Sequence, residues 1–319
     1  MTTAVLLGFA AILATLTPKL AGAAWADRAP RLAIHTWQAA TVGLVATAVL
    51  AGLTLLVPAT AIGGGLAQIL DACATTIASV YGAPERLPAV LLGTLLAAVL
   101  PAHLAVVAAR TVWRDRRTRR DLARAIALGA RAEPSLDALV LDSDRPAAFC
   151  LPGRHRAIVL TSAALAALTA DELAGVLAHE REHLRARHHL AVTAARIFER
   201  AVPGLPLFAH ARVQIERLVE LLADDAAARQ VDRLHIASAM ITLAGMRAPR
   251  PALAAAQESA ALRVTRLLAP TPPVPARYRL VIATAAVGAV LGPLAVAAWP
   301  LVSAVSNGLC LLPGGTGWA

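Results

Sequence analysis

The sequence contains almost no lysine, few aromatic residues and no charge in its last forty positions. Lys19 is the only lysine, and aromatic residues make up 3% of the 319 residues, so alanine, leucine and valine supply most of the 58% hydrophobic content. Of the 30 basic residues, 26 lie between Arg110 and Arg279, and no basic or acidic residue follows. Charge confined to one segment is typical of membrane topology and argues against a basic stripe that binds nucleic acid.

Four segments are apolar and long enough to cross a lipid bilayer. A hydrocarbon core of about 30 Å takes roughly 20 residues of helix. The mean hydropathy of the chain is positive, which excludes an ordinary soluble domain. We therefore predict a mainly α-helical membrane protein with transmembrane helices at about residues 3–16, 33–57, 88–109 and 280–302.

The first of these segments is short, and a cleaved signal peptide is the alternative interpretation. No basic residue precedes it, and Pro18 and Lys19 follow it directly, so we expect a retained span. Residues 62–80 are less apolar and contain three consecutive glycines and Asp71. We predict an interfacial or extracytoplasmic loop there.

The distribution of arginine predicts the orientation of the chain. The third predicted span is followed closely by Arg110, Arg114, Arg116, Arg117, Arg119 and Arg120. Because basic residues concentrate on the cytoplasmic side, the segment after this span is predicted to be cytoplasmic and both termini extracytoplasmic. We expect a multi-pass protein of the inner (plasma) membrane, in contact with the lipid bilayer.

The three cysteines fall on both sides of the membrane in this topology. Cys73 and Cys310 are predicted outside, where a disulfide between them can form, while Cys150 lies in the reducing cytosol. The disulfide is a hypothesis, and the sequence leaves both outcomes open.

The chain divides into three parts by composition. Residues 1–109 carry three spans and their loops, residues 110–278 form one cytoplasmic domain, and residues 279–319 form the fourth span and a short tail. Within the domain we predict a helix leaving the membrane at 110–129, two strands at 147–151 and 157–160, a helix that begins at Thr169, and helices at 211–230, 234–246 and 252–268. Thr169 and Glu172 have the spacing of a capping box.

A zinc-binding pattern lies inside the capped helix. The run His179-Glu180-Arg181-Glu182-His183 places its two histidines one turn apart on the same face. Both imidazoles can therefore reach one Zn²⁺, and Glu180 can take a proton from a zinc-bound water. We predict His179 and His183 as metal ligands and Glu180 as the catalytic base.

The third metal ligand is predicted on a later helix. Glu220 and Asp224 share one face of an otherwise apolar helix, where a carboxylate is costly to bury without a strong partner. We predict Glu220 as the ligand and Asp224 as the acceptor of a hydrogen bond from the distal nitrogen of a ligand histidine. The alternative ligand is His189, ten residues after His179, but that arrangement needs a glycine turn and Ala186 stands there.

The remaining polar candidates have less specific predictions. Solvated helix surface is expected for Glu216, Asp225 and His188, a turn for His155, and packing or a hydrogen bond at the spans for His35 and His103. The sequence leaves open whether an oxyanion is stabilised by His210 or His235.

These motifs resemble those of the gluzincin membrane peptidases of families M48 and M56. The resemblance rests on the two ligand motifs and on three preceding stretches: His179–His183, Glu220–Asp224, Phe149–Gly153, Ala157–Thr161 and Leu168–Leu173. It implies an α+β zincin-like domain with Zn²⁺ as cofactor. It also implies that the strand around Ile158 lies at the edge of a small sheet and can pair with an extended substrate.

The order of three spans, a zinc domain and a fourth span is similar to family M56, typified by the BlaR1/MecR1 antibiotic sensors. This resemblance implies a zinc endopeptidase that cleaves a cytoplasmic or membrane-proximal protein, with a winged-helix repressor of the BlaI/MecI kind as the favoured substrate. The large penicillin-binding domain of those sensors is not expected here, because only a short tail follows the fourth span.

Two alternatives remain open. One is a quality-control peptidase for membrane proteins, similar to HtpX in family M48, and the other is a non-catalytic zinc-binding scaffold in signalling. The expected partners are a protein substrate and the bilayer, without direct nucleic-acid binding. A homo-oligomer is compatible with either reading.

Overall fold

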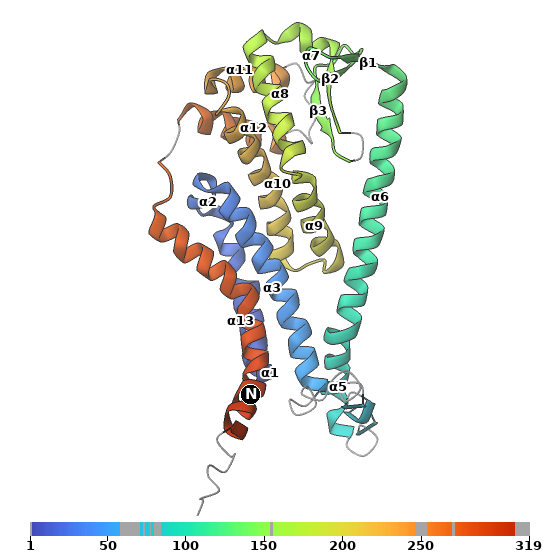
Figure 1. The fold of residues 1–319 in the computed structure, drawn as a ribbon, viewed down its shortest axis with the longest axis vertical. Helices are drawn as coiled ribbons and strands as arrows, with labels where there is room; N and C mark the ends of the chain where they lie inside the picture. The colour runs from blue at the N-terminus through green and yellow to red at the C-terminus, as the bar shows by residue number, and fades with distance from the viewer. Residues whose placement is uncertain are drawn as a thin grey trace, which may run out of the picture.

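The structure is a computed structural model that describes residues 2–57, 71–72, 74–76, 78–79, 84–153, 156–245, 254–269 and 272–309. Long helices extend along one axis and carry, at one end, a group of shorter helices with a small sheet (Figure 1). The described part is mostly helical, as predicted. Cys73, Cys310, His155 and most of the loop predicted at 62–80 lie outside the described residues, so their predictions stay untested.

Four helical stretches in the described residues are long and apolar enough to cross a membrane. They are α1 (Thr2–Leu16) with the 3-10 turn η1 (Thr17–Gly22), α3 (Pro30–Leu56), the continuous helix of α5 (Leu87–Thr94), η5 (Leu95–Val99) and α6 (Leu100–Gly129), and α13 (Ala276–Leu309). Each of them overlaps one of the predicted spans.

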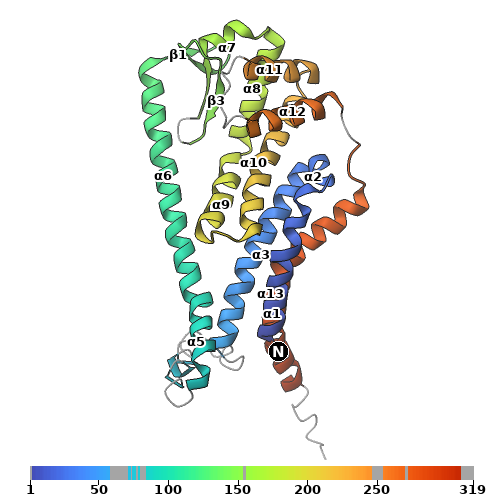
Figure 2. The same ribbon diagram turned by 180° about the vertical axis from the view of Figure 1, so that it is seen from behind.

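The third span and the charged helix after it form one continuous element. The π-turn η5 ends two residues before Pro101, which has no N–H to donate to a helical carbonyl, so the wider turn accommodates this proline. α6 then runs past the arginine cluster to the sheet (Figure 2). The helix predicted at residues 110–129 is the second half of α6.

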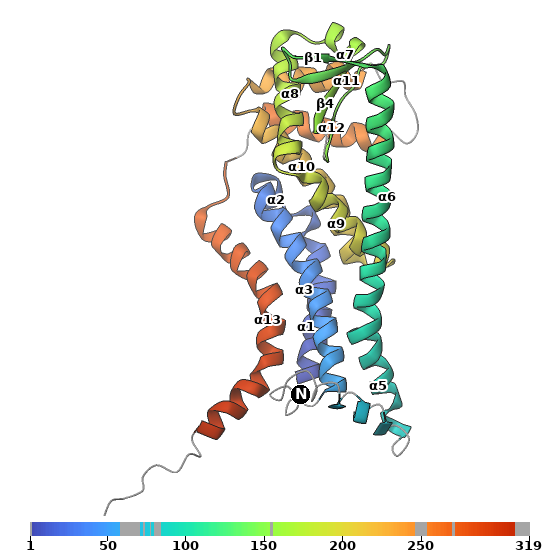
Figure 3. The ribbon, with the colours of Figure 1, turned by 45° about the vertical axis from the view of Figure 1, so that its right-hand side comes forward.

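The start of α1 and the end of α13 lie at the end of the molecule opposite the sheet (Figures 1 and 3). This placement matches four membrane crossings with a domain between the third and the fourth. It holds for either face of the membrane, so the cytoplasmic orientation stays a prediction.

Glycines allow α3 to approach its neighbours closely. A Cβ atom on Gly43 would overlap the backbone carbonyl of Ala289 in α13. A Cβ atom on Gly52 would lie 2.7 Å from the backbone nitrogen of Ala97 in η5. Lipid supplies no hydrophobic force between helices, so close packing at small residues is a main source of their association.

Helices α9 (His188–Ala201) and α10 (Pro206–Ala227) form a hairpin that packs against the spans. Near its tip, Phe208 belongs to the same buried cluster as Leu44, which lies midway along α3. Further along α10, Ile215 packs in a cluster with Trp37 of α3. Apolar burial along both clusters therefore fixes α10 relative to the membrane helices.

Four short strands form one sheet in the order β1-β2-β4-β3. β4 is central and pairs in parallel with β2 and antiparallel with β3, while β1 pairs antiparallel with β2. The strands are β1 (Ala130–Glu133), β2 (Ala138–Leu141), β3 (Ala148–Leu151) and β4 (Ala157–Thr161).

The edge position implied for the strand around Ile158 is wrong. Both sides of β4 are paired, with Ile158 opposite Cys150 on β3 and Val159 opposite Leu139 on β2. Ile158, Val159 and the following Leu160 are all buried. An unbroken apolar run is typical of a strand covered on both faces. The sheet edge beside this strand is therefore β3.

The histidine motif lies on α8 (Ala170–Arg185). The remaining helical elements are α2 (Trp25–Arg28), the 3-10 turn η4 (Pro84–Arg86), α7 (Ser162–Ala167), α11 (Arg233–Gly245) and α12 (Ala254–Leu268). Leu177 of α8 packs in one core with β4, and the adjacent Ala178 packs in another with α11 and α12. α8 therefore lies between the sheet and these two helices.

Gly43→Ala should destabilise the protein, because the added methyl group overlaps backbone atoms of α13 that a side-chain movement cannot clear. Overpacking of this kind costs about 1–3 kcal/mol. Gly288→Ala on α13 is the matched control, since a Cβ atom there meets nothing within 4 Å. Thermal unfolding in detergent, followed by circular dichroism, measures the difference. Equal midpoints for both variants would contradict the close crossing.

Candidate metal centre

The helix that carries the two candidate histidines begins with the predicted capping box, which is confirmed. The Thr169 hydroxyl accepts a hydrogen bond from the Glu172 amide, and the Glu172 carboxylate accepts one from the Thr169 amide at 2.8 Å. The Ser238 hydroxyl of α11 donates a further hydrogen bond to Glu172. These hydrogen bonds lower the pKa of Glu172, and the one from Ser238 has the largest effect. The start of α8 is thus anchored to α11.

The structure brings His179, His183 and Glu220 into one cluster of potential ligand atoms. The two Nε2 atoms are 3.0 Å apart, and the Glu220 oxygens lie 3.6 Å from His179 Nε2 and 3.5 Å from His183 Nε2. Ligand atoms about 2.05 Å from a tetrahedral zinc ion would be about 3.3 Å from one another. The measured distances lie on either side of that value, so the three donors fit three corners of a zinc site.

Asp224 holds the other nitrogen of His179. Its Oδ1 lies 3.0 Å from His179 Nδ1, and its side chain is 1% exposed. Burial acts to lower the pKa of His179, but hydrogen bonds to Asp224 and Glu220 outweigh burial and raise it to about 9. A proton kept on Nδ1 by Asp224 leaves Nε2 as the nitrogen that can bind a metal. This is the contact expected of Asp224 from the sequence.

His183 has a partner that the sequence did not indicate. The sequence predicts His188 on solvated surface, but this residue is buried, and its Nδ1 lies 3.0 Å from His183 Nδ1. α8 ends at Arg185, and Arg187 adopts a left-handed backbone conformation with φ 52°. The resulting turn brings the first residue of α9 to His183. A spacing of five residues places no pair on one helical face, so periodicity gave no signal.

His189 remains outside the cluster. Among the described residues, only His179, His183 and Glu220 group as potential metal ligands. His189 Nδ1 is buried and has no hydrogen-bond partner within the described ranges, and the side chain lines a neighbouring cavity. The chain does turn after α8, at Arg187 and without a glycine, yet this turn does not bring His189 into the ligand cluster.

Glu180 lies half-buried beside Cys150 of β3. Burial is the main cause that raises the pKa of Glu180. The pKa of the Cys150 thiol is raised to about 12, mainly by burial and, to a smaller extent, by the charge of Glu180. At neutral pH Cys150 is therefore a protonated hydrogen-bond donor to Glu180.

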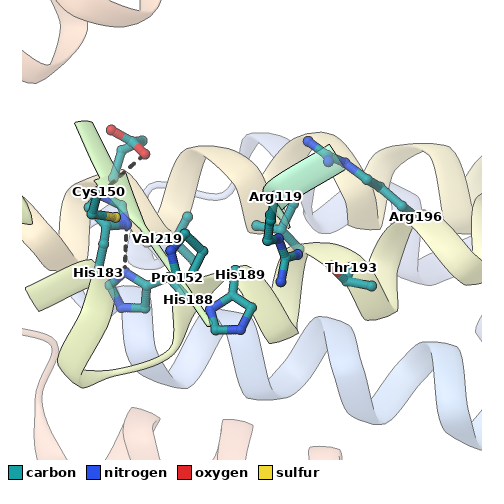
Figure 4. A pocket seen from close by; sticks show the side chains of 11 residues that line it. Arg119, Cys150, Pro152, His183, His188, His189, Thr193, Arg196 and Val219 are labelled. Atoms are coloured by element: carbon teal, nitrogen blue, oxygen red, sulfur yellow. Dashed lines mark hydrogen bonds and ion pairs between the residues drawn. The ribbon is translucent and has the colours of Figure 1, made fainter. Parts of the chain in front are cut away.

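A cavity of about 250 Å³ adjoins the cluster and is lined by residues of α6, β3, α8, α9 and α10. His183 and Cys150 lie at one end of it, and Arg119, Thr193 and Arg196 lie at the other (Figure 4). Cys150 belongs to β3, which lies at one edge of the sheet and has no partner on its outer side among the described residues.

The two oxyanion candidates lie away from the cluster. His210 Nδ1 is 2.7 Å from the Pro206 carbonyl of its own helix, and the ten residues that separate it from Glu220 span about 15 Å of helix. His235 Nδ1 lies 3.5 Å from a carboxylate oxygen of Asp171, at the start of α8. Neither histidine is in place to stabilise an oxyanion at the cluster.

The acids predicted on solvated surface form ion pairs instead. Glu216 lies 3.0 Å from Arg196 and 2.9 Å from Arg212, and Asp225 lies 2.7 Å from Arg266. The histidines at the spans form the hydrogen bonds allowed for them: His103 Nε2 lies 3.1 Å from the Ala201 carbonyl and His35 Nδ1 lies 3.4 Å from Gln38 Oε1.

Comparison with known proteins gives matches to peptidases. Residues 109–204 match the family model described as Peptidase family M48, a segment that includes the sheet, α8 and both histidines but ends before Glu220. A part of 57 residues is 49% identical to a protein of Acidiphilium cryptum (strain JF-5) described as "Protease HtpX homolog" and covers 17% of this chain. The chain spans about a fifth of the length of that relative, 20%. No solved structure matches the chain.

These matches show a relation to M48 peptidases over the segment that holds the histidine motif. The closer resemblance to family M56 has no support in them. Because the matched parts are short, they do not show the activity or the substrates of the whole protein.

Glu172→Gln should destabilise the protein at neutral pH, because the capping and Ser238 hydrogen bonds to the charged carboxylate weaken. The folded-state pKa is lowered, so this stabilisation is present above the unfolded pKa of about 4.3 and is lost as the pH falls through the folded value. The difference between wild type and variant should therefore shrink in acid. Denaturant unfolding at several pH values measures it. Ser238→Ala should show part of the same pH dependence, and a pH-independent difference would contradict the assignment.

Proposed function

We propose that this protein is a membrane-embedded zinc endopeptidase. The observation that carries the proposal is the convergence of His179 Nε2, His183 Nε2 and the Glu220 carboxylate at distances that suit one zinc ion. Two imidazoles and one carboxylate are a donor set of catalytic zinc sites, which keep a further position for water. The relation of residues 109–204 to peptidases supports peptide-bond hydrolysis as the reaction.

A zinc ion held by these residues would supply an activated water and polarise the substrate carbonyl. Glu180 then takes a proton from the attacking water and returns it to the leaving amine. Burial raises the pKa of Glu180 toward the range in which a general base works at neutral pH. Asp224 and His188 orient the two ligand imidazoles through contacts with their Nδ1 atoms.

The substrate is proposed to bind as an extended strand along the outer edge of β3. The edge contains Cys150, and both Cys150 and the following Pro152 line the cavity next to the ligand cluster. An added strand would satisfy the unpaired main-chain groups of β3. Main-chain pairing does not depend on substrate side chains, so we expect low sequence specificity.

We propose membrane proteins and membrane-proximal segments as the substrate class. One matched relative is described as an HtpX homologue, which favours the quality-control alternative over repressor cleavage. The hairpin that carries Glu220 packs directly against α3, so the cluster is tied to the spans. The arginine distribution supports an inner-membrane location with the cluster on the cytoplasmic side.

Glu180→Gln should separate metal binding from catalysis. The purified variant should bind zinc as the wild type does. It should cleave an unfolded protein such as casein at least about 100-fold more slowly than the wild type, because the general base is lost. Elemental mass spectrometry measures the zinc, and gel-based cleavage assays measure the rate. Glu220→Ala should lose zinc, while His189→Ala should keep it. Full activity of Glu180→Gln, or full zinc content in Glu220→Ala, would refute the proposal.

His188→Phe should weaken zinc binding by about 10- to 100-fold, because His183 Nδ1 loses its hydrogen-bond partner. His188→Asn should retain most of the affinity, since its amide group can occupy the position of the imidazole Nδ1. Competition with a fluorescent zinc chelator measures both values. Equal affinity of His188→Phe and wild type would show that His183 needs no orienting partner.

A further inference from the structure

Arg263 of α12 bridges the two carboxylates that face the histidine helix. Its Nε lies 2.7 Å from Asp224 Oδ2, its Nη2 lies 2.6 Å from Asp224 Oδ1, and its Nη1 lies 3.0 Å from Glu220 Oε2. Asp224 Oδ1 is also the atom that contacts His179 Nδ1. One guanidinium thus contacts the expected third ligand and the residue that orients the first.

This bridge depends on the shape of the guanidinium group. Arginine presents its donors in a planar fork and can bind one carboxylate with two of them while a third reaches another acceptor. The Arg263 side chain is 16% exposed and that of Asp224 is 1% exposed, so water cannot replace the contact easily. Without Arg263, a buried carboxylate would keep only the His179 contact, which is costly.

A second arginine one turn along α12 contacts a different part of the protein. Arg266 forms two hydrogen bonds with Asp225, at 2.7 and 2.9 Å, and its Nε donates to the backbone carbonyl of Asp27 at 3.1 Å. Asp27 belongs to α2, between the first and second spans. α12 is therefore docked at once on α10 and on the segment that joins these two spans.

We propose that Arg263 is a positioning residue of the metal centre and that Arg266 holds α12 in the place where Arg263 can act. The segment between the first two spans would then influence the geometry of Glu220 through α12. This inference rests on the proposed function only in that the cluster binds a metal. It requires no assumption about the substrate.

The test compares four variants of the full-length protein in detergent: Arg263→Gln, Arg263→Lys, Arg266→Gln and the control Thr265→Ala. Thr265 lies on the exposed face of the same helix, between the two arginines. Zinc affinity is measured by chelator competition, and Co²⁺ replaces zinc to report the ligand geometry through its visible absorption. Circular dichroism establishes that each variant is folded.

Arg263→Gln should lower zinc affinity about 10- to 100-fold and change the Co²⁺ spectrum, because Glu220 and Asp224 lose their common partner. Arg263→Lys should recover part of the loss, since it keeps the charge without the fork. Arg266→Gln should lower the affinity less, and Thr265→Ala should match the wild type. The lysine variant keeps the test decisive if the glutamine variant fails to fold.

Two results would overturn the inference. Wild-type zinc affinity and an unchanged Co²⁺ spectrum in folded Arg263→Gln, or in Arg263→Lys if the glutamine variant does not fold, would remove its positioning role. An Arg266→Gln variant identical to Thr265→Ala would remove the link to the segment between the spans. A wild-type protein that binds zinc but cleaves nothing would refute the peptidase proposal and leave the positioning role intact.

Discussion

The burial of Asp224 and the half-burial of Glu220 on α10 are the constraint on which the rest of the site depends. Glu220 and Asp224 lie one turn apart on a helix with apolar neighbours, where an isolated charge is costly. Partners therefore have to converge on them, and they come from two helices at once, His179 from α8 and Arg263 from α12. The same contacts that pack α8 and α12 against α10 therefore also determine the arrangement of the ligand atoms.

The membrane helices also determine the position of the cluster. The α9–α10 hairpin packs on α3 through apolar clusters that include Phe208 and Ile215. Charged groups on the hairpin are paired with one another, as in the contact of Arg212 with Glu199 at 2.6 Å, which lowers the cost of placing them near lipid. Rigid packing of α10 on the spans, and not a flexible tether, therefore determines where the cluster lies relative to the membrane.

Sequence patterns were sufficient wherever a feature lies on a single helix. The apolar lengths indicated the spans, and one-turn spacings indicated the pairs that the structure brings together around Glu220. His188 and Arg263 reach the cluster only through a left-handed turn and the docking of α12, which no spacing encodes. β1 has little apolar alternation and was missed, since its pairing with β2 decides its conformation. The unbroken apolar run in β4 is itself typical of a central strand, whereas the edge position implied by the family resemblance is wrong.

The outer edge of β3 is only four residues long and is followed by Pro152. The main-chain groups of such a short edge can pair with any extended backbone. They cannot pair with a segment whose own main-chain groups are already hydrogen-bonded in a helix or a sheet. Selection among potential targets would then depend on conformational opening: the rate at which a protein is cut would follow the fraction of time that its segments spend locally unfolded. Intact neighbours in the same membrane would be spared by their own stability, without any recognition tag.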